Sequence, residues 1–388
     1  MPDLVAVALP GADLLPVLDA AWADGDAVLP IAPDLPVPAR RRLLVALRPA
    51  RLVTADGVSP CPEPAPVVAG TALVIATSGS TGEPKGVVLS SAALSSSNTA
   101  SLARIGARHG ERWLCCLPLH HIAGLQVVLR SRALGREPLL QPRFDVAAVA
   151  TAVQASDVVH VSLVPTQLSR LLDAGTDLRG CRTVLLGGAP ASAALLRRAR
   201  RLGLAVVTTY GMSETCGGCV YDGVPLAGVE IAIDDDGIIH IDGPVLFDGY
   251  RLRPELSAAV LQDRGLRTDD LGRIGADGRL EVLGRADDVI ISGGHKVPAA
   301  EVNALLASHP GVAEAAVFPR PDADWGQRVV AAVVPADPSA PPDLDSLRAH
   351  ISARAAAWKA PRELLVLTAL PRTALGKVDR GALQRRRG

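Results

Sequence analysis

The sequence has few aromatic residues, few cysteines and no excess of charge of either sign. Aromatic residues make up 3% of its 388 residues, so alanine, leucine and valine must build the core. Lysine plus arginine and aspartate plus glutamate number 40 each, and the formal net charge is zero. Because nucleic-acid-binding proteins usually carry a basic excess, nucleic acid is not expected as a main partner. Six cysteines are too few for a disulfide scaffold.

Signals for membrane insertion, secretion and metal binding are also missing. No apolar run reaches the roughly 20 residues that a membrane-spanning helix needs. The opening stretch MPDLVAVALPGADLL has no basic segment before its apolar part, unlike a secretory signal. Cys216 and Cys219 form one CxxC with no second Cys or His pair, which favours a turn over a zinc or redox site. We therefore expect a cytoplasmic protein of two or three domains.

Strands alternate with helices in the middle of the chain. Apolar runs predict buried strands at 71–77, 113–119, 158–164, 183–188 and 205–211, and a helix at 192–203. This alternation predicts an α/β fold with mainly parallel sheets flanked by helices, whose carboxyl-end loops hold ligands. Residues 224–283 are more β-like. A small α+β domain follows, with helices at 299–307 and 343–357 and strands at 312–318, 328–334 and 363–367.

The segment TSGSTGEPKGV at 77–87 is rich in glycine and hydroxyl groups and contains one lysine. Glycines let backbone N–H groups converge on one point, and the added hydroxyls and positive charge suit a phosphate chain. A flexible surface loop is the alternative interpretation. The segment is not a Walker A loop, because Lys85 is followed by Gly86, and it lacks the Gly-x-Gly-x-x-Gly of dinucleotide-binding proteins.

This segment resembles the signature of the adenylate-forming superfamily, which includes acyl-CoA synthetases, peptide-synthetase adenylation domains and luciferases. Further motifs of that superfamily follow in order: YGMSE at 210–214, GYRLRPE at 249–255, TDDLG at 268–272, GRADD at 284–288 and PRTALGKVDR at 371–380. In TDDLG, Asp269 stands where the family usually has glycine. The ordered set identifies the chain as a member of this superfamily.

Only 76 residues precede the glycine-rich segment, whereas family members usually have over a hundred more, so we expect a shortened N-terminal subdomain. Short versions of this kind resemble the actinobacterial o-succinylbenzoate–CoA ligases of menaquinone synthesis. The segments that carry this narrower likeness are LPLHHIAG at 117–124, SLVPTQLSRLL at 162–172 and YGMSETCGGCVYDGVPL at 210–226.

The resemblance implies an ATP-dependent, AMP-forming ligase that joins a carboxylic acid to CoA through an acyl-adenylate. ATP, Mg²⁺ and coenzyme A as co-substrate are the expected small molecules, and a homodimer is left open. The resemblance also implies a large domain at 1–284 and a mobile C-terminal domain at 285–388. These domains would alternate between two arrangements about a hinge at Asp287.

The resemblance assigns catalytic roles to three residues. Lys85 would bind phosphates, Glu214 would be the protein ligand of Mg²⁺, and Lys377 would contact both the carboxylate and the α-phosphate. Tyr210 would pack on adenine, and Asp270 and Arg285 would hold the ribose. The full set expected to bind ATP or AMP is Thr77, Ser78, Gly79, Ser80, Thr81, Gly82, Gly187, Gly188, Ala189, Tyr210, Gly211, Met212, Ser213, Asp270 and Arg285.

For the acid, the resemblance points to His121, Thr166, Gly217 and Gly218, with His120 able to exchange roles with His121; the group that binds the distal carboxylate is not assigned. Gly293 and Gly294 would let the pantetheine arm of CoA pass, and Lys296 is expected either near CoA or as a solvated side chain.

Three alternative functions stay open at this point. They are a ligase for another acid, an adenylation enzyme that loads a separate carrier protein, and a non-catalytic nucleotide-binding homologue. The retained residues that argue against the last are Lys85, Glu214, Asp270, Arg285 and Lys377.

Overall fold

The computed structural model describes residues 1–78, 83–155, 157–371 and 378–386 of the chain. By its internal contacts the chain divides into two compact units. The first comprises residues 1–191, 198–232 and 240–267, and the second comprises 192–197, 233–239 and 268–388. This division does not test where the chain hinges, so the predicted boundary at 284/285 and the hinge at Asp287 stay predictions.

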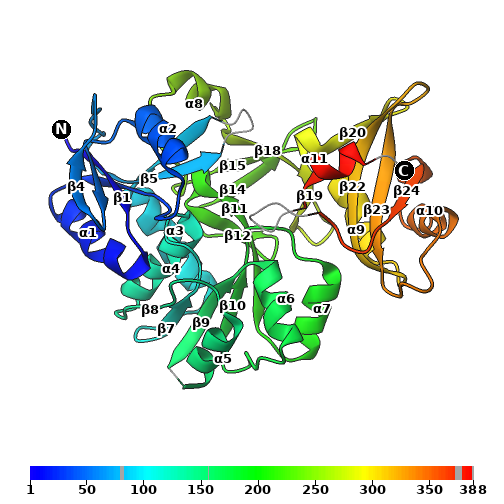
Figure 1. Ribbon diagram of the computed structural model, residues 1–388, viewed down its shortest axis with the longest axis horizontal. Helices are drawn as coiled ribbons and strands as arrows, with labels where there is room; N and C mark the ends of the chain where they lie inside the picture. Colours follow the sequence, from blue (N-terminus) through cyan, green and yellow to red (C-terminus); the bar gives the residue numbers. More distant parts are fainter. Residues whose placement is uncertain (79–82, 156, 372–377, 387–388) are drawn as a thin grey trace. The chain divides into compact units, whose positions relative to one another are not determined.

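One sheet of the first unit contains β1 (Leu4–Ala8), β2 (Ala27–Pro30), β3 (Arg51–Thr54), β4 (Gly57–Pro60), β5 (Thr71–Ser78), β6 (Pro84–Ser90) and β16 (Gly249–Tyr250). Their order is β16-β6-β5-β2-β1-β3-β4. The central strands β3, β1, β2 and β5 are parallel, and β4, β6 and β16 are antiparallel additions at the two edges. The helix α1 (Gly11–Ala23) packs against β1 and β2, and α2 (Val37–Leu47) packs against β6 (Figure 1).

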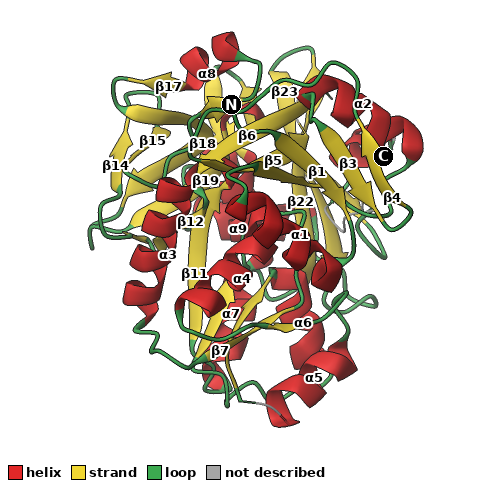
Figure 2. Ribbon diagram, turned by 90° about the vertical axis from the view of Figure 1, so that its left-hand side faces the viewer, coloured by secondary structure: helices red, strands yellow, loops and turns green. Residues whose placement is uncertain are grey.

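A second sheet contains β7 (Arg112–Cys115), β8 (Leu139–Leu140), β9 (Val158–Leu163), β10 (Thr183–Leu186), β11 (Val206–Met212), β12 (Gly217–Tyr221) and β13 (Val224–Pro225). Its order is β13-β12-β11-β10-β9-β7-β8, and the strands from β11 to β8 are all parallel. The accompanying helices are α3 (Ser91–Ile105), α4 (Ile122–Ala133), α5 (Val146–Ala155), α6 (Pro165–Asp173) and α7 (Ala193–Arg201). Helices α3 and α4 pack against β12 (Figure 2). The predicted α/β class with largely parallel strands is confirmed.

A third sheet contains β14 (Glu230–Ile233), β15 (Ile238–Asp242), β17 (Leu261–Gln262), β18 (Gly265–Ile274) and β19 (Leu280–Arg285); α8 (Pro254–Val260) lies before β17. Its order is β14-β15-β18-β17, with β19 paired to β18. The fourth sheet lies in the second unit and contains β20 (Val289–Ser292), β21 (His295–Pro298), β22 (Val312–Asp322), β23 (Gly326–Pro335) and β24 (Glu363–Val366). The helices of this region are α9 (Ala299–Ala307), α10 (Leu344–Ser352) and α11 (Arg380–Arg385).

The predicted α+β pattern of the C-terminal region is confirmed, although the strand predicted at 312–318 extends to Asp322 and the strand predicted at 328–334 runs from Gly326 to Pro335. The helix predicted at 343–357 ends at Ser352 and is followed by a separate 3₁₀ turn, Ala357–Lys359. The core is built mainly from leucine, valine and alanine, as the aromatic-poor composition predicts, and Trp113, Tyr221 and Phe318 are among its largest fully buried side chains. In the described part of the chain, no helix has both the length and the apolar character to cross a membrane.

Arg251 is a buried cation held by backbone carbonyls. Its side chain is 6% exposed. The guanidinium donates to the carbonyl of Leu47 at 2.6 Å and to those of Arg48 and Pro66 at 3.2 Å each, and it also bonds the carbonyl of Ala65. The backbone N–H of Arg251 donates to the carbonyl of Gly86 at 2.8 Å. A charge buried this way is tolerated only when its donors are satisfied, so Arg251 fastens the end of α2 and the proline-rich connector to β6 and β16.

We expect Arg251→Met to lower the free energy of unfolding by about 3 kcal/mol, because buried carbonyls lose their donors. Urea denaturation followed by circular dichroism measures the change. The matched control is Arg179→Met, which removes an exposed arginine paired with Asp177 and is expected to leave the free energy of unfolding almost unchanged. Equal effects of the two substitutions would contradict the bracing role of Arg251.

Candidate active site

The two ends of the glycine-rich segment belong to the paired antiparallel strands β5 and β6. Thr77 is paired with Lys85, and Ser78 with Pro84, so the predicted loop at 77–87 is wrong at both ends, where the residues belong to β5 and β6. A Cβ at Gly86 would lie 2.7 Å from Leu47 Cδ2, so this glycine permits close packing within a strand. The predicted phosphate-binding residues that lie outside the described residues are Gly79, Ser80, Thr81 and Gly82.

Glu214 lies on a tight turn between β11 and β12. Gly211 pairs with Gly218, and a Cβ at Gly211 (φ 157°) would come within 2.0 Å of the carbonyl oxygen of Gly217, so the two strands require glycine there. Ser213–Thr215 form a 3₁₀ turn. The Thr215 hydroxyl accepts from the Met212 N–H at 2.9 Å and donates to the Gly217 carbonyl at 2.7 Å.

A buried glutamine ties this turn to α4. Gln126 is fully buried, and its Nε2 donates to the carbonyl of Cys216 at 2.6 Å. Cys216 itself adopts a left-handed backbone conformation with φ 54°, which ends the 3₁₀ turn. These bonds hold the backbone of the turn, so the position of Glu214 is fixed from both sides.

The Glu214 side chain meets residues of the first sheet. The Tyr250 hydroxyl donates to Glu214 Oε1 at 2.8 Å, and the Phe247 N–H donates to the Glu214 carbonyl, also at 2.8 Å. Lys85 Nζ lies 5.2 Å from the centroid of the Tyr250 ring, within the range of a cation–π contact. The structure therefore brings Lys85 and Glu214 together through Tyr250. Tyr250 belongs to the GYRLRPE motif, but the sequence alone indicates no role for it.

The donor chemistry around Glu214 suits Mg²⁺. No group of three or more His, Cys, Asp or Glu side chains able to hold a metal occurs among the residues described. Mg²⁺ in phosphate-transferring sites commonly takes one or two carboxylates together with substrate phosphates rather than a complete protein cage. The half-buried Glu214 carboxylate fits that arrangement, with Lys85 near enough to share a phosphate chain.

The carboxyl ends of β10 and β11 lie side by side, which places the predicted adenine-binding residues together. An ideal Cβ at Gly187 would lie 2.2 Å from Thr209 Oγ1, next to Tyr210 on β11. Gly188 has φ +77° and turns the chain away from the sheet, and Ala189 is exposed. Tyr210 is half-buried.

The residues predicted to bind the carboxylic acid lie at the starts of α4 and α6 and at the start of β12 in the β11–β12 hairpin. His121 precedes α4 and is exposed, whereas His120 is half-buried; their ring centroids are 4.4 Å apart. Thr166 is exposed in the first turn of α6, and the neighbouring Gln167 accepts from the Val164 N–H at 3.0 Å, which caps that helix. Gly217 and Gly218 begin β12.

The second unit brings Asp270 and Arg285 together on β18 and β19, where they are paired in register. Arg285 Nη2 donates to Asp269 Oδ2 at 3.1 Å and its Nε donates to Asp287 Oδ1 at 3.2 Å, while Asp270 Oδ1 lies 4.0 Å from Nε. Burial alone would lower the pKa of Arg285, but the hydrogen bond to Asp287 and the surrounding carboxylates raise it. The aspartate that replaces the usual family glycine at 269 therefore binds the predicted ribose-contacting arginine.

The predicted CoA-facing segment is the β20–β21 hairpin. Gly293 and Gly294 form its turn with φ 57° and 78°, and a Cβ at Gly293 would lie 2.4 Å from a ring carbon of Trp325. Lys296 is exposed and pairs with Asp236 at 3.1 Å. Lys377 lies outside the described residues.

The cysteine thiols of the CxxC are buried. Burial, with smaller contributions from Asp248 and Cys219, raises the pKa of Cys216 to about 12, and burial raises that of Cys219 to about 12. Metal binding and redox exchange need thiolates, so protonated, buried thiols are poorly suited to either.

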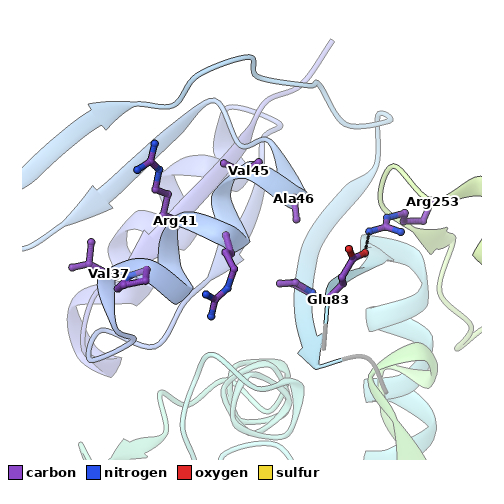
Figure 3. A pocket seen from close by; sticks show the side chains of 9 residues that line it. Val37, Arg41, Val45, Ala46, Glu83 and Arg253 are labelled. Atoms are coloured by element: carbon purple, nitrogen blue, oxygen red, sulfur yellow. Dashed lines mark hydrogen bonds and ion pairs between the residues drawn. The ribbon is translucent and has the colours of Figure 1, made fainter. Parts of the chain in front are cut away.

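An open groove lies between α2, the start of β6 and Arg253, as Figure 3 shows. Arg253 pairs with Glu83 at 2.6 Å across one end of it. None of its lining residues is one of the predicted site residues. They are Val37, Pro38, Arg41, Arg42, Val45, Ala46, Glu83, Pro84 and Arg253.

Comparison with known proteins gives consistent matches along the chain. The profile of the family described as "AMP-binding enzyme" matches residues 24–251, and that of "AMP-binding enzyme C-terminal domain" matches 301–377. A relative from Mycobacterium tuberculosis, named probable 2-succinylbenzoate–CoA ligase, is 45% identical over 325 residues, which cover 81% of this chain and 84% of the relative.

Two solved structures from Bacillus subtilis are similar over nearly all of this chain. One is an o-succinylbenzoate CoA synthetase in complex with its acyl-adenylate intermediate, with a TM-score of 0.85 and 31% identity, covering 99% of this chain and 88% of that one. The other is the same synthetase with ATP and magnesium ion, with a TM-score of 0.82 and 30% identity, covering 98% and 89% of the two chains.

His120 predicts a specific pH dependence of stability. Burial and the adjacent His121 lower the pKa of His120 to about 4, and Asp34 acts in the opposite direction. In the unfolded chain a histidine titrates near 6.5, so between pH 6.5 and about 4 the unfolded state binds the extra proton and stability falls as the pH falls. We expect His120→Gln to lose less stability than the wild type over this interval. Urea midpoints at pH 7.5, 6 and 5 test this, and parallel curves for the two proteins would contradict it.

Proposed function

The chain belongs to the AMP-binding enzyme family, and from this premise we propose that it is an ATP-dependent 2-succinylbenzoate–CoA ligase of menaquinone biosynthesis. The observation that carries the proposal is the 45% identity to a relative with that name over most of both chains. The similarity to a synthetase solved with its acyl-adenylate supports the same reaction. We also propose a cytoplasmic location, where ATP and CoA are available, and a homodimer, which light scattering would test.

The proposed reaction has two steps because a carboxylate is a poor electrophile. In the first step an oxygen of the acid attacks the α-phosphorus of ATP, the bond to the β-phosphate oxygen breaks, and pyrophosphate leaves. In the second step the CoA thiol displaces AMP from the acyl carbon. The first step requires in-line placement of the acid and neutralisation of phosphate charge.

Residues of the first unit would bind the triphosphate and the base. Lys85 supplies a positive charge beside Glu214, and Thr77 and Ser78, the last two residues of β5, would add hydroxyl groups that contact the phosphates. Bound Mg²⁺ would neutralise phosphate charge, with Glu214 as its protein ligand. Tyr210, beside the end of β10, would pack on adenine next to Gly187 and Gly188. The neighbouring Gly211, Met212 and Ser213 would complete this wall.

Residues of the second unit would bind the ribose and carry the change between steps. Asp270 would accept from the ribose hydroxyls while Arg285, held among carboxylates, makes the second contact. Lys377 would bind the carboxylate and α-phosphate during adenylation. Rotation about Asp287 would then bring Gly293, Gly294 and Lys296 to the CoA side. This rotation would break the ion pair between Lys296 and Asp236. Because the pair is exposed, its loss would cost little free energy.

The acid would lie between the β11–β12 hairpin and the segment before α4. Gly217 and Gly218 would lie beside the aromatic ring. A Cβ at Gly218 would already lie 3.0 Å from Thr209 Cβ, whereas one at Gly217 would meet Gln126 Cγ only at 3.6 Å, so Gly217 offers the more open side. His121 and Thr166, both exposed, would contact the acid from the starts of α4 and α6. Burial lowers the pKa of His120 to about 4, so this neighbour would contribute a neutral ring.

We expect the protein to release pyrophosphate from MgATP in the presence of 2-succinylbenzoate and to form its CoA thioester. A panel of carboxylic acids, assayed by pyrophosphate release with and without CoA, measures the preference. A protein that acts only on fatty acids or only on amino acids would overturn the proposed substrate and leave the ligase chemistry standing.

Two substitutions should separate the half-reactions. Lys377→Ala should slow adenylation roughly 10²–10³-fold, because a preorganised charge is lost from the transition state. It should convert preformed acyl-adenylate and CoA at nearly the wild-type rate. Asp287→Pro should do the opposite, since a fixed φ obstructs rotation at the proposed hinge. Single-turnover rates for each step decide this, and equal slowing of both steps by Lys377→Ala would disprove its assigned role.

A further inference from the structure

Tyr250 contacts both charged side chains that the first unit would offer to a nucleotide. Its hydroxyl donates to Glu214 Oε1 at 2.8 Å, and Lys85 Nζ lies 5.2 Å from the centre of its ring. Glu214 comes from the β11–β12 turn, Lys85 from β6 and Tyr250 from β16. One side chain therefore sets the relation between an acid and a base on different sheets.

The Tyr250 backbone is itself firmly placed. Tyr250 pairs with Val87 of β6, and its N–H donates to the Ser257 hydroxyl at 2.7 Å. The Phe247 ring meets the Tyr250 ring edge-on with centroids 5.0 Å apart. The next residue, Arg251, is the buried arginine held by carbonyls. The tyrosine can thus orient its partners, because its backbone is held in β16 and its ring packs against Phe247.

We propose that Tyr250 is a positioning residue for MgATP, which orients the Glu214 carboxylate for the cation and holds Lys85 beside it. This inference rests on the proposed function. The Tyr250 hydroxyl donates to Oε1, one of the two oxygens of the Glu214 carboxylate. This bond fixes the rotation of the carboxylate group. The ring face attracts the Lys85 ammonium without neutralising it, so the full positive charge stays available for phosphate oxygens.

The two contacts can be removed separately. Tyr250→Phe deletes the hydroxyl and keeps the ring under Lys85, whereas Tyr250→Leu deletes both. The matched control is Tyr221→Phe, which removes a buried tyrosine hydroxyl bonded to Ser101 Oγ at 2.7 Å on β12. Tyr221 takes no part in the contacts of Tyr250 with Glu214 and Lys85. The control variant therefore shows how much the loss of a tyrosine hydroxyl elsewhere in the protein changes ATP and Mg²⁺ binding.

Calorimetric titration of ATP at several Mg²⁺ concentrations, without any acid, provides the test. We expect Tyr250→Phe to raise the Mg²⁺ concentration needed for half-maximal enhancement of ATP affinity about tenfold, the range expected for a lost hydrogen bond to a charged group. ATP affinity without Mg²⁺ should stay near the wild-type value for Tyr250→Phe and fall for Tyr250→Leu. Tyr221→Phe should leave both quantities unchanged.

Several results would overturn the proposal. They are a wild-type Mg²⁺ dependence in Tyr250→Phe, an equal shift in Tyr221→Phe, or equal ATP affinities of the Phe and Leu variants without Mg²⁺. Thermal unfolding of each variant shows whether a shift reflects loss of folded protein. The titrations contain no carboxylic acid, so their outcomes do not depend on whether 2-succinylbenzoate is the substrate. A wild-type protein that fails to bind MgATP would overturn the proposed function together with this inference.

Discussion

The attachment of the Glu214 turn to residues 247–250 is the constraint on which the candidate site depends. The turn belongs to the second sheet, and residues 249–250 are the edge strand of the first. The bonds from Phe247 to the Glu214 carbonyl and from Tyr250 to its carboxylate join the two, while the Asp248 N–H donates to the Val88 carbonyl at 2.9 Å. The two sheets therefore meet at the carboxylate that would hold the metal, and a displacement of either sheet would move it.

Glycine and small residues make this meeting possible. At Gly211 a side chain would collide with the Gly217 backbone, and at Gly86 it would collide with Leu47 and Val74. The close approach of backbone at Gly211 and of side chains at Gly86 therefore leaves no room for a larger residue at either position. Two of the few aromatic residues, Phe247 and Tyr250, pack edge-on against each other beside Glu214, and the Tyr250 hydroxyl has the Glu214 carboxylate as its partner.

The α/β class and the family could be predicted from the sequence, but the contacts that make the site could not. Periodicity located the helix at 299–307 and the strand at 158–163 to within a residue, because each reflects a local pattern of burial. The strand residues at both ends of the segment 77–87 resembled a loop in the sequence, because a glycine that serves close packing in a strand, such as Gly86, has the same appearance as one that serves a turn. The partners of Arg251 lie about 200 positions away along the chain, and Tyr250 is 36 positions from Glu214. No spacing rule connects residues so distant, so only the folded chain identifies Tyr250.

The second unit shows a related coupling at a smaller scale. Arg285, expected to contact the ribose, donates to Asp287, expected to be the hinge, only two residues further on. Asp269 is a second carboxylate partner that a glycine at that position would not supply. If the chain rotates at Asp287, the Asp287 carboxylate moves relative to the guanidinium, and Asp269 with Asp270 on β18 are the partners positioned to keep it oriented. Under the proposed function, the bond to Asp269 would therefore keep the Arg285 guanidinium oriented while Asp287 changes conformation.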